Sequence, residues 1–130
     1  MTPAELIRAA AAARENAYAP YSNYEVGAVL LTRSGKIYTG CNVESASYGL
    51  TVCAERVAFF KAVSEGATDF ESMAIVTRNG ASMCGACRQV AREFAPDLVV
   101  HLGDASLAFH STTLAHLLPD SFGPDSLTEA

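Results

Sequence analysis

The sequence predicts an α/β fold, a three-layer α/β/α sandwich with a five-stranded mixed sheet. The main support is that predicted helices and strands alternate along the chain. Segments whose apolar residues recur at helical spacing separate short runs of apolar and β-branched residues, which are typical of strands. Residues 72–77 are nearly all apolar, as is typical of a strand buried on both faces. The 130 residues contain no internal repeat and no low-complexity linker, so we expect a single domain spanning residues 1–130.

The first predicted helix occupies residues 2–18. Thr2 is a suitable N-cap, Pro3 takes the first helical position, and Glu5 follows the cap by three residues. The apolar residues that recur at helical spacing, and that should face the sheet, are Leu6, Ala9, Ala10 and Ala13.

A β-hairpin should follow, with strands over residues 24–32 and 37–43. Both runs are rich in apolar and β-branched residues, and the turn between them, residues 33–36, contains a glycine. Residues 44–50 are small and polar, which indicates a loop. The next helix is predicted over residues 53–65. The side chains expected to face inward from it are Ala54, Val57, Ala58 and Ala62.

The remaining elements complete the alternation. After the strand at 72–77, a helix should run over residues 84–94. It should end there because Pro96 prevents its continuation. Two more strands are predicted at 97–102 and 107–112. The sequence then indicates a closing helix over residues 112–119 and a tail, residues 120–130, without a strong pattern.

The charge balance limits the classes of partner. Half of the residues are apolar, 18% are charged, and the formal net charge is −5, which fits a folded chain rather than a disordered one. A surface that tracks nucleic-acid phosphates needs a basic face, so we expect no nucleic-acid partner. A neutral small ligand is compatible with this balance.

The cysteines suggest metal binding or chemistry rather than disulfides. Residues 1–19 lack the pattern of a secretory signal, and the apolar run 26–31 is too short to span a bilayer, so we expect a cytoplasmic protein with no membrane partner. In that compartment thiols stay reduced, which disfavours a disulfide set. Cys84 and Cys87 have the spacing of two zinc ligands in one helical turn, and Cys53 occupies the start of the other predicted helix. Helix N-termini favour thiolates.

Two kinds of zinc site remain open at this stage. A closed structural site needs a fourth protein ligand, and the candidates are Cys41, His101, His110 and His116. A catalytic site needs only the three cysteines and leaves the fourth position open. Glu55 favours the second alternative, since a carboxylate at the helix end that is not itself a ligand can transfer protons. Arg56 follows it, and we expect its guanidinium to lie behind the ligands and to offset part of the thiolate charge.

These motifs resemble a known family. "CAE" and "MCGAC" resemble the signature of the zinc deaminases, with Met83 in place of a proline. Longer segments, among them "YAPYSNYEVGAVLL", "GCNVESASYGLTVCAER" and "CGACRQVAREF", are similar to the small homotetrameric cytidine deaminases over nearly the whole chain. The resemblance implies a cytidine-deaminase-like fold and hydrolytic, zinc-dependent deamination of cytidine or 2′-deoxycytidine in pyrimidine salvage.

The same resemblance implies roles for individual residues. Cys53, Cys84 and Cys87 would bind zinc, and Glu55 would carry protons to N3 of the base and to the departing ammonia. The residues implied to contact the nucleoside are Asn42 and Glu44 at the ribose 3′-hydroxyl, the backbone around Ala54 at the base edge, and Tyr24 against the base. Ala46 and Tyr48 match positions that enter the site of a neighbouring subunit, which implies a homotetramer.

Three positions depart from the family pattern and keep other hypotheses open. Ser45 stands where asparagine is typical, Tyr24 replaces phenylalanine, and Met83 replaces proline. One alternative is therefore a deaminase with shifted scope, acting on N4-substituted cytidines or on a blasticidin-like aminopyrimidine. An alternative of another class is a structural zinc-binding module.

Overall fold

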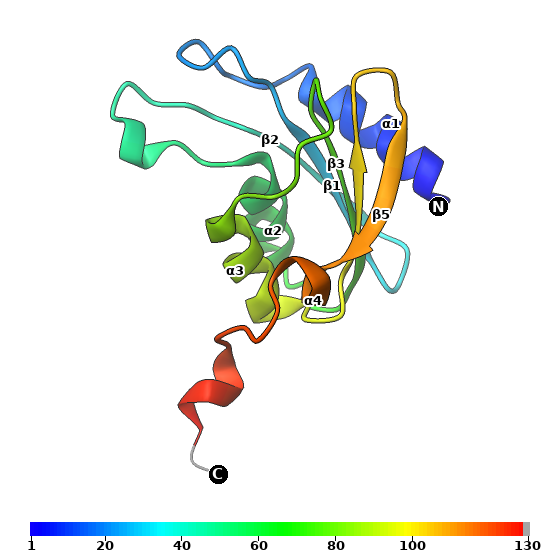
Figure 1. Ribbon diagram of the computed structural model, residues 1–130, viewed down its shortest axis with the longest axis vertical. Helices are drawn as coiled ribbons and strands as arrows, with labels where there is room; N and C mark the ends of the chain where they lie inside the picture. Colours follow the sequence, from blue (N-terminus) through cyan, green and yellow to red (C-terminus); the bar gives the residue numbers. More distant parts are fainter. Residues whose placement is uncertain (129–130) are drawn as a thin grey trace.

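A five-stranded mixed sheet forms the centre of the computed structural model, which describes residues 1–128 (Figure 1). The strands, in their order across the sheet, are β2 (Ile37–Cys41), β1 (Gly27–Thr32), β3 (Phe70–Val76), β4 (Val99–Gly103) and β5 (Phe109–Thr113). β3 and β4 run parallel, and the other neighbouring pairs are antiparallel. The predicted mixed sheet is thus confirmed.

Helices cover both faces of this sheet (Figure 1). α1 (Pro3–Arg14) packs its side chains against one face, where Leu6 and Ile7 meet Val29 and Val76. α2 (Ala54–Ser64), α3 (Gly85–Phe94) and the short α4 (Leu114–Leu117) cover the other face and enclose the larger apolar cluster. The three predicted layers are therefore present.

The start of α1 agrees with the prediction, and its end does not. Glu5 N donates to Thr2 Oγ1 over 3.1 Å and Thr2 N donates to Glu5 Oε1 over 2.9 Å, so both halves of the capping box form. The helix ends at Arg14 rather than at residue 18. Its buried residues are Leu6, Ile7, Ala10 and Ala13, so that Ile7 takes the place expected of Ala9.

The hairpin strands are shorter than predicted because the side chain of Asn42 forms hydrogen bonds with the backbone of the segment before β1. Asn42 Oδ1 accepts from Val26 N over 2.9 Å, and Asn42 Nδ2 donates to Tyr24 O over 2.8 Å. Val26 O still accepts from Asn42 N over 3.3 Å, but Val26 N and Tyr24 O bond the Asn42 side chain instead of the partner strand, so β1 begins only at Gly27. β3 behaves as predicted, since it lies between β1 and β4 and all of its residues except Glu71 are buried.

Smaller differences concern α2 and the C-terminal segment. Phe59 is fully buried in α2, whereas Val57, which we expected to face inward, is only partly buried. A 3₁₀-helix, Pro124–Leu127, forms in the tail for which the sequence showed no pattern, and the last two residues of that tail lie outside the described residues. Within residues 1–128, no helix has the length and apolar character needed to cross a membrane.

A glycine in β2 allows α2 to approach the sheet closely. A Cβ atom at Gly40 would lie 2.3 Å from Ala54 O and 2.7 Å from Ala58 N, distances at which backbone would have to move. Gly40 pairs with Ala28 in the hairpin, so its position along the sheet is fixed. The missing side chain therefore sets where the first turn of α2 lies.

We expect Gly40→Ala to destabilise the fold by about 1–3 kcal/mol, because the added methyl group must displace the backbone of α2. Urea unfolding of the variant and of the unmodified chain measures this difference. Gly49→Ala is the matched control, since a Cβ there meets no atom within 4 Å. Equal stability of the two variants would contradict the close approach.

Candidate metal centre and active-site pocket

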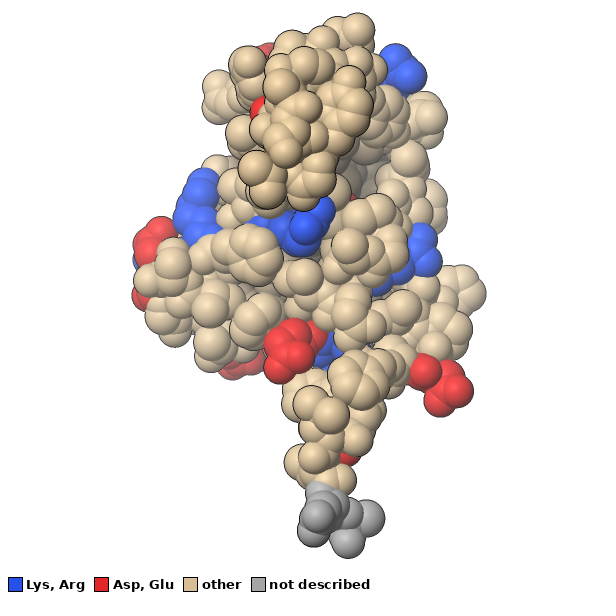
Figure 2. Space-filling view, turned by 90° about the vertical axis from the view of Figure 1, so that its left-hand side faces the viewer, with Lys and Arg blue, Asp and Glu red and all other residues tan. Residues whose placement is uncertain are grey.

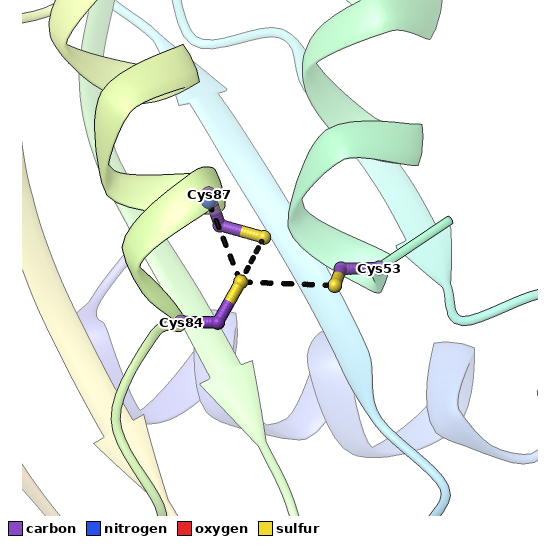
Figure 3. Close-up of side chains that lie close together, drawn as sticks. All are labelled: Cys53, Cys84 and Cys87. Atoms are coloured by element: carbon purple, nitrogen blue, oxygen red, sulfur yellow. Dashed lines mark hydrogen bonds between the residues drawn. The ribbon is translucent and has the colours of Figure 1, made fainter. Parts of the chain in front are cut away.

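Three cysteine sulfurs converge where α2 and α3 begin (Figure 3). Cys53 is the N-cap of α2, Cys84 is the N-cap of α3, and Cys87 lies in the first turn of α3. The Sγ atoms of Cys53 and Cys84 are 3.9 Å apart, and those of Cys84 and Cys87 are 3.2 Å apart. All three lie within 4.8 Å of one another. The two helix starts thus deliver the three thiols predicted as ligands to one point.

This donor set fits zinc. Tetrahedral zinc with Zn–S bonds of about 2.3 Å places its sulfur ligands roughly 3.8 Å apart, which is close to the spacing between Cys53 and Cys84. No other group of three or more histidine, cysteine or acidic side chains within residues 1–128 has its donor atoms close enough to hold a metal ion. A cluster of three ligands suits a catalytic site with an open position rather than a closed structural one.

The candidates for a fourth protein ligand lie elsewhere in the described structure. His101 pairs in the sheet with Ala74, which belongs to the apolar cluster under α1, so its side chain lies on the face opposite the cysteines. His110 and His116 line a separate pocket near β5 and α4. Cys41 lies in β2 and pairs with Gly27. The closed structural alternative therefore lacks its fourth ligand.

Hydrogen bonds stabilise negative charge on the cluster. Arg56 Nη2 donates to Cys53 Sγ over 3.4 Å, as expected for a guanidinium behind the ligands. The neighbouring Cys87 thiol and the hydrogen bond from Arg56 lower the pKa of Cys53 to about 5, against the opposing effect of burial. The pKa of Cys87 is raised by the neighbouring Cys53 sulfur and by burial. Cys87 N also donates to Cys84 Sγ over 3.4 Å, as a free amide of a helix start does.

The cluster borders a pocket of about 270 Å³. The residues that line it are Ser22, Tyr24, Val26, Asn42, Glu44, Thr51, Cys53, Ala54, Glu55, Ile75, Thr77, Ala81, Ser82 and Cys84. No lysine or arginine is among these lining residues. On the face drawn in Figure 2, basic side chains form small separate groups rather than a continuous surface. The pocket therefore suits a small uncharged ligand better than an anionic one.

Glu55 combines burial with access to the pocket. Only 5% of its surface is exposed, and it lies in the first turn of α2 directly after Ala54. Burial raises the pKa of its carboxyl group to about 7, and the neighbouring Cys53 thiolate adds to this increase. A carboxyl group that changes protonation near neutral pH can both accept and release a proton.

Asn42 and Glu44 line the pocket and also organise its wall. Besides the bonds of Asn42 to residues 24 and 26, Glu44 Oε1 accepts from Tyr21 N over 2.9 Å and from Ser22 N over 3.1 Å. The Ser22 hydroxyl donates to Glu44 Oε2, and these hydrogen bonds lower the pKa of Glu44. Both side chains therefore fix the segment around residues 21–26 while they face the pocket.

The other predicted contact residues divide into two groups. Tyr24 and Ala54 line the same pocket. Ala46 and Tyr48 do not line it. Both are exposed, and 75% of the surface of Tyr48 is accessible. The Tyr48 ring packs edge-on against Tyr21, with ring centroids 5.8 Å apart.

Arg88 is a residue of the site that the sequence analysis missed. Its Nε donates to Met83 O over 2.8 Å and its Nη2 to Ser82 Oγ over 3.2 Å, so it holds the two residues before Cys84. Its Nη1 donates to Leu117 O over 2.6 Å, which ties the same loop to α4. Arg88 follows Cys87 directly, as Arg56 follows Glu55, and this adjacency is the signal that identified Arg56.

Known proteins resemble this chain over almost its whole length. Residues 2–102 match the family model described as the cytidine and deoxycytidylate deaminase zinc-binding region. A cytidine deaminase of Sporosarcina psychrophila is 47% identical over 97% of this chain and 95% of its own, and one of Halalkalibacterium halodurans is 46% identical over 95% and 96%. The crystal structure of a cytidine deaminase from Burkholderia pseudomallei shares 50% identity and a TM-score of 0.91, covering 94% of this chain and 100% of that one. These similarities favour neither the blasticidin-type alternative nor a structural zinc module.

We expect Arg88→Ala to weaken zinc binding about 10- to 100-fold, because the loop before Cys84 loses its fixed position. Competition with a colorimetric chelator measures the zinc affinity, and circular dichroism shows whether the fold is kept. Arg92→Ala is the control, because this arginine of the same helix binds Ser121 and Asp125 of the C-terminal segment instead. Equal zinc affinity in both variants would show that Arg88 does not position the ligand loop.

Proposed function

This chain belongs to the cytidine and deoxycytidylate deaminase family, and we propose that it converts cytidine and 2′-deoxycytidine to uridine and 2′-deoxyuridine. Water adds at C4 of the base, the C4–N4 bond breaks, and N4 leaves as ammonia. The observation that carries this proposal is the convergence of Cys53, Cys84 and Cys87 at the border of a pocket that also contains the buried Glu55.

The metal would be held by the three cysteine sulfurs. A zinc ion bound there supplies an acidified water molecule, the nucleophile of the hydrolysis. Three thiolates would leave such a site with a net negative charge, which opposes this acidification. The guanidinium of Arg56, which donates to Cys53, and the N-termini of α2 and α3 offset part of that charge.

Glu55 is the proposed proton carrier. Its carboxylate accepts a proton from the attacking water and passes it to N3 of the base. It then accepts the second proton from the new hydroxyl group at C4 and delivers it to the departing amino group, so that C4=O forms as ammonia leaves. Its place in the pocket beside Cys53, without membership of the sulfur cluster, supports this role. Burial excludes bulk water from the carboxyl group, so protons are exchanged with the substrate.

The nucleoside would lie along the pocket wall. Asn42 and Glu44 would bind the ribose 3′-hydroxyl. Asn42 has a second Nδ2 hydrogen, and the Glu44 carboxylate has lone pairs, that their hydrogen bonds to the pocket wall leave available. The backbone around Ala54 would meet the edge of the base, and the ring of Tyr24 would pack against it. The absence of basic groups from the lining supports a nucleoside rather than a nucleotide as substrate.

A homotetramer with shared sites completes this proposal. Ala46 and Tyr48 would enter the pocket of a neighbouring subunit, and their exposure outside the pocket of their own chain supports this. We further propose that residues 1–130 act as one deaminase domain, and that the protein serves pyrimidine salvage in the cytoplasm.

We expect Glu55→Gln to lower the rate of ammonia release from cytidine by at least about 100-fold, because the amide cannot carry a proton. Zinc content and circular dichroism should not change. Glu71→Gln is the control, an exposed carboxylate of β3 outside the pocket, and should retain full activity. Loss of the metal or of the fold in Glu55→Gln would give this residue a structural role instead.

We expect light scattering to give a mass about four times that of the 13.7 kDa chain. Tyr48→Ala should then raise the KM for cytidine, because each pocket would lose a group supplied by its neighbour. A monomer with full deaminase activity would contradict the roles of Ala46 and Tyr48.

A further inference from the structure

The pocket is walled by two loops that come from different parts of the chain. One contains Tyr24 and Val26 and precedes β1, and the other runs from Thr77 after β3 to Cys84. Within residues 1–128, the hydrogen bond that joins these loops directly is the one from Tyr24 Oη to Asn79 Oδ1, 2.6 Å long. The guanidinium carbon of Arg78 also lies 5.0 Å from the centroid of the Tyr24 ring.

Asn79 is connected in turn to the loop that leads to the metal ligands. Thr77 Oγ1 donates to Asn79 Oδ1 over 3.3 Å, and Ala81 N donates to Thr77 Oγ1 over 2.9 Å. Thr77 and Ala81 line the pocket, whereas Asn79 does not. The backbone of Asn79 also forms a bridge with Asp104, next to the end of β4. Asn79 therefore joins the Tyr24 hydroxyl to a segment that is anchored to the sheet.

This arrangement separates the two ends of the Tyr24 side chain. The residue lines the pocket, while its hydroxyl donates to an acceptor outside the lining. The polar group is thereby satisfied without an acceptor from the substrate. The ring is left as an apolar surface of fixed orientation, held by Asn79 at its hydroxyl and by Arg78 over its face.

We propose that the Tyr24–Asn79 hydrogen bond is a bracket that holds the two pocket walls in their substrate-binding arrangement, with Asn79 as a positioning residue. The proposal rests on the proposed function, since it concerns how that pocket receives a nucleoside. Walls that are fixed in advance lose less conformational freedom when a ligand binds, so the bracket increases affinity without taking part in the chemistry. It therefore lowers the KM and leaves kcat unchanged.

The test is a double-mutant cycle with Tyr24→Phe and Asn79→Ala. Calorimetric titration with uridine, the product, measures a Kd that does not require turnover, and ammonia release from cytidine gives KM and kcat. We expect each single variant to raise the Kd and the KM about two- to tenfold, the range of one hydrogen bond, with kcat within about twofold. The double variant should bind no more weakly than the weaker single variant, because both remove the same bond.

Asn79→Asp is the matched conservative variant. Its carboxylate retains an acceptor for the Tyr24 hydroxyl, so we expect the uridine Kd to stay within about twofold of the unmodified protein. In the Tyr24→Phe background, Asn79→Asp and Asn79→Ala should not differ. A purely structural role of Asn79 through Thr77 would instead make the two single effects multiply in the double variant.

The outcomes distinguish this proposal from the proposed function. Unchanged Kd and KM values in both single variants, multiplying effects in the double variant, or a fall in kcat alone would overturn the bracket while cytidine turnover by the unmodified protein stands. Binding of uridine without turnover of cytidine would overturn the proposed function, and the Kd values would still decide about the bracket. Binding of neither nucleoside would overturn both.

Discussion

Three sulfur donors meet within 4.8 Å. As metal ligands they would be thiolates, whose negative charges repel one another at this spacing, so the site depends on the groups that offset this charge. Two helices begin at this point, and an amide hydrogen of α3 (Cys87 N) bonds the Cys84 sulfur. Arg56 adds a full positive charge beside Cys53. Such convergence needs a close approach of α2 to the sheet, which the missing side chain of Gly40 permits. The position of the metal centre thus depends on a glycine on the strand beneath it.

Neighbouring residues of the pocket beside the sulfur cluster differ in their environment and their contacts. Cys53 and Glu55 are two residues apart at one helix end, yet the first belongs to the sulfur cluster and the second is a buried carboxyl whose pKa is raised to about 7. Asn42 and Glu44 hold the loop before β1 by hydrogen bonds to its backbone, and the same side chains face the pocket. A pocket wall that is held in place by hydrogen bonds from its own lining side chains needs little rearrangement to bind a ligand.

The departures from the family pattern have local compensations in the structure. The hydroxyl of Tyr24 finds an acceptor in Asn79. Met83, in the position of a proline, is 2% exposed, and its carbonyl oxygen accepts a hydrogen bond from Arg88. The rigidity that a proline would give the loop is thus supplied by a guanidinium that also reaches Ser82 and α4. Ser45 keeps a local role, since its hydroxyl accepts from Ser47 N over 3.1 Å.

The sequence by itself determined the features that depend on near neighbours in the chain. Capping by Thr2 and Glu5, the apolar run of β3, and cysteines at two helix starts are local patterns, and each was predicted correctly. Only the tertiary structure decided which distant groups meet. Tyr24 and Asn79 are 55 residues apart, and the sheet register places His101 on the face away from the cysteines. Such contacts follow from how strands pair and helices pack, which no local pattern encodes.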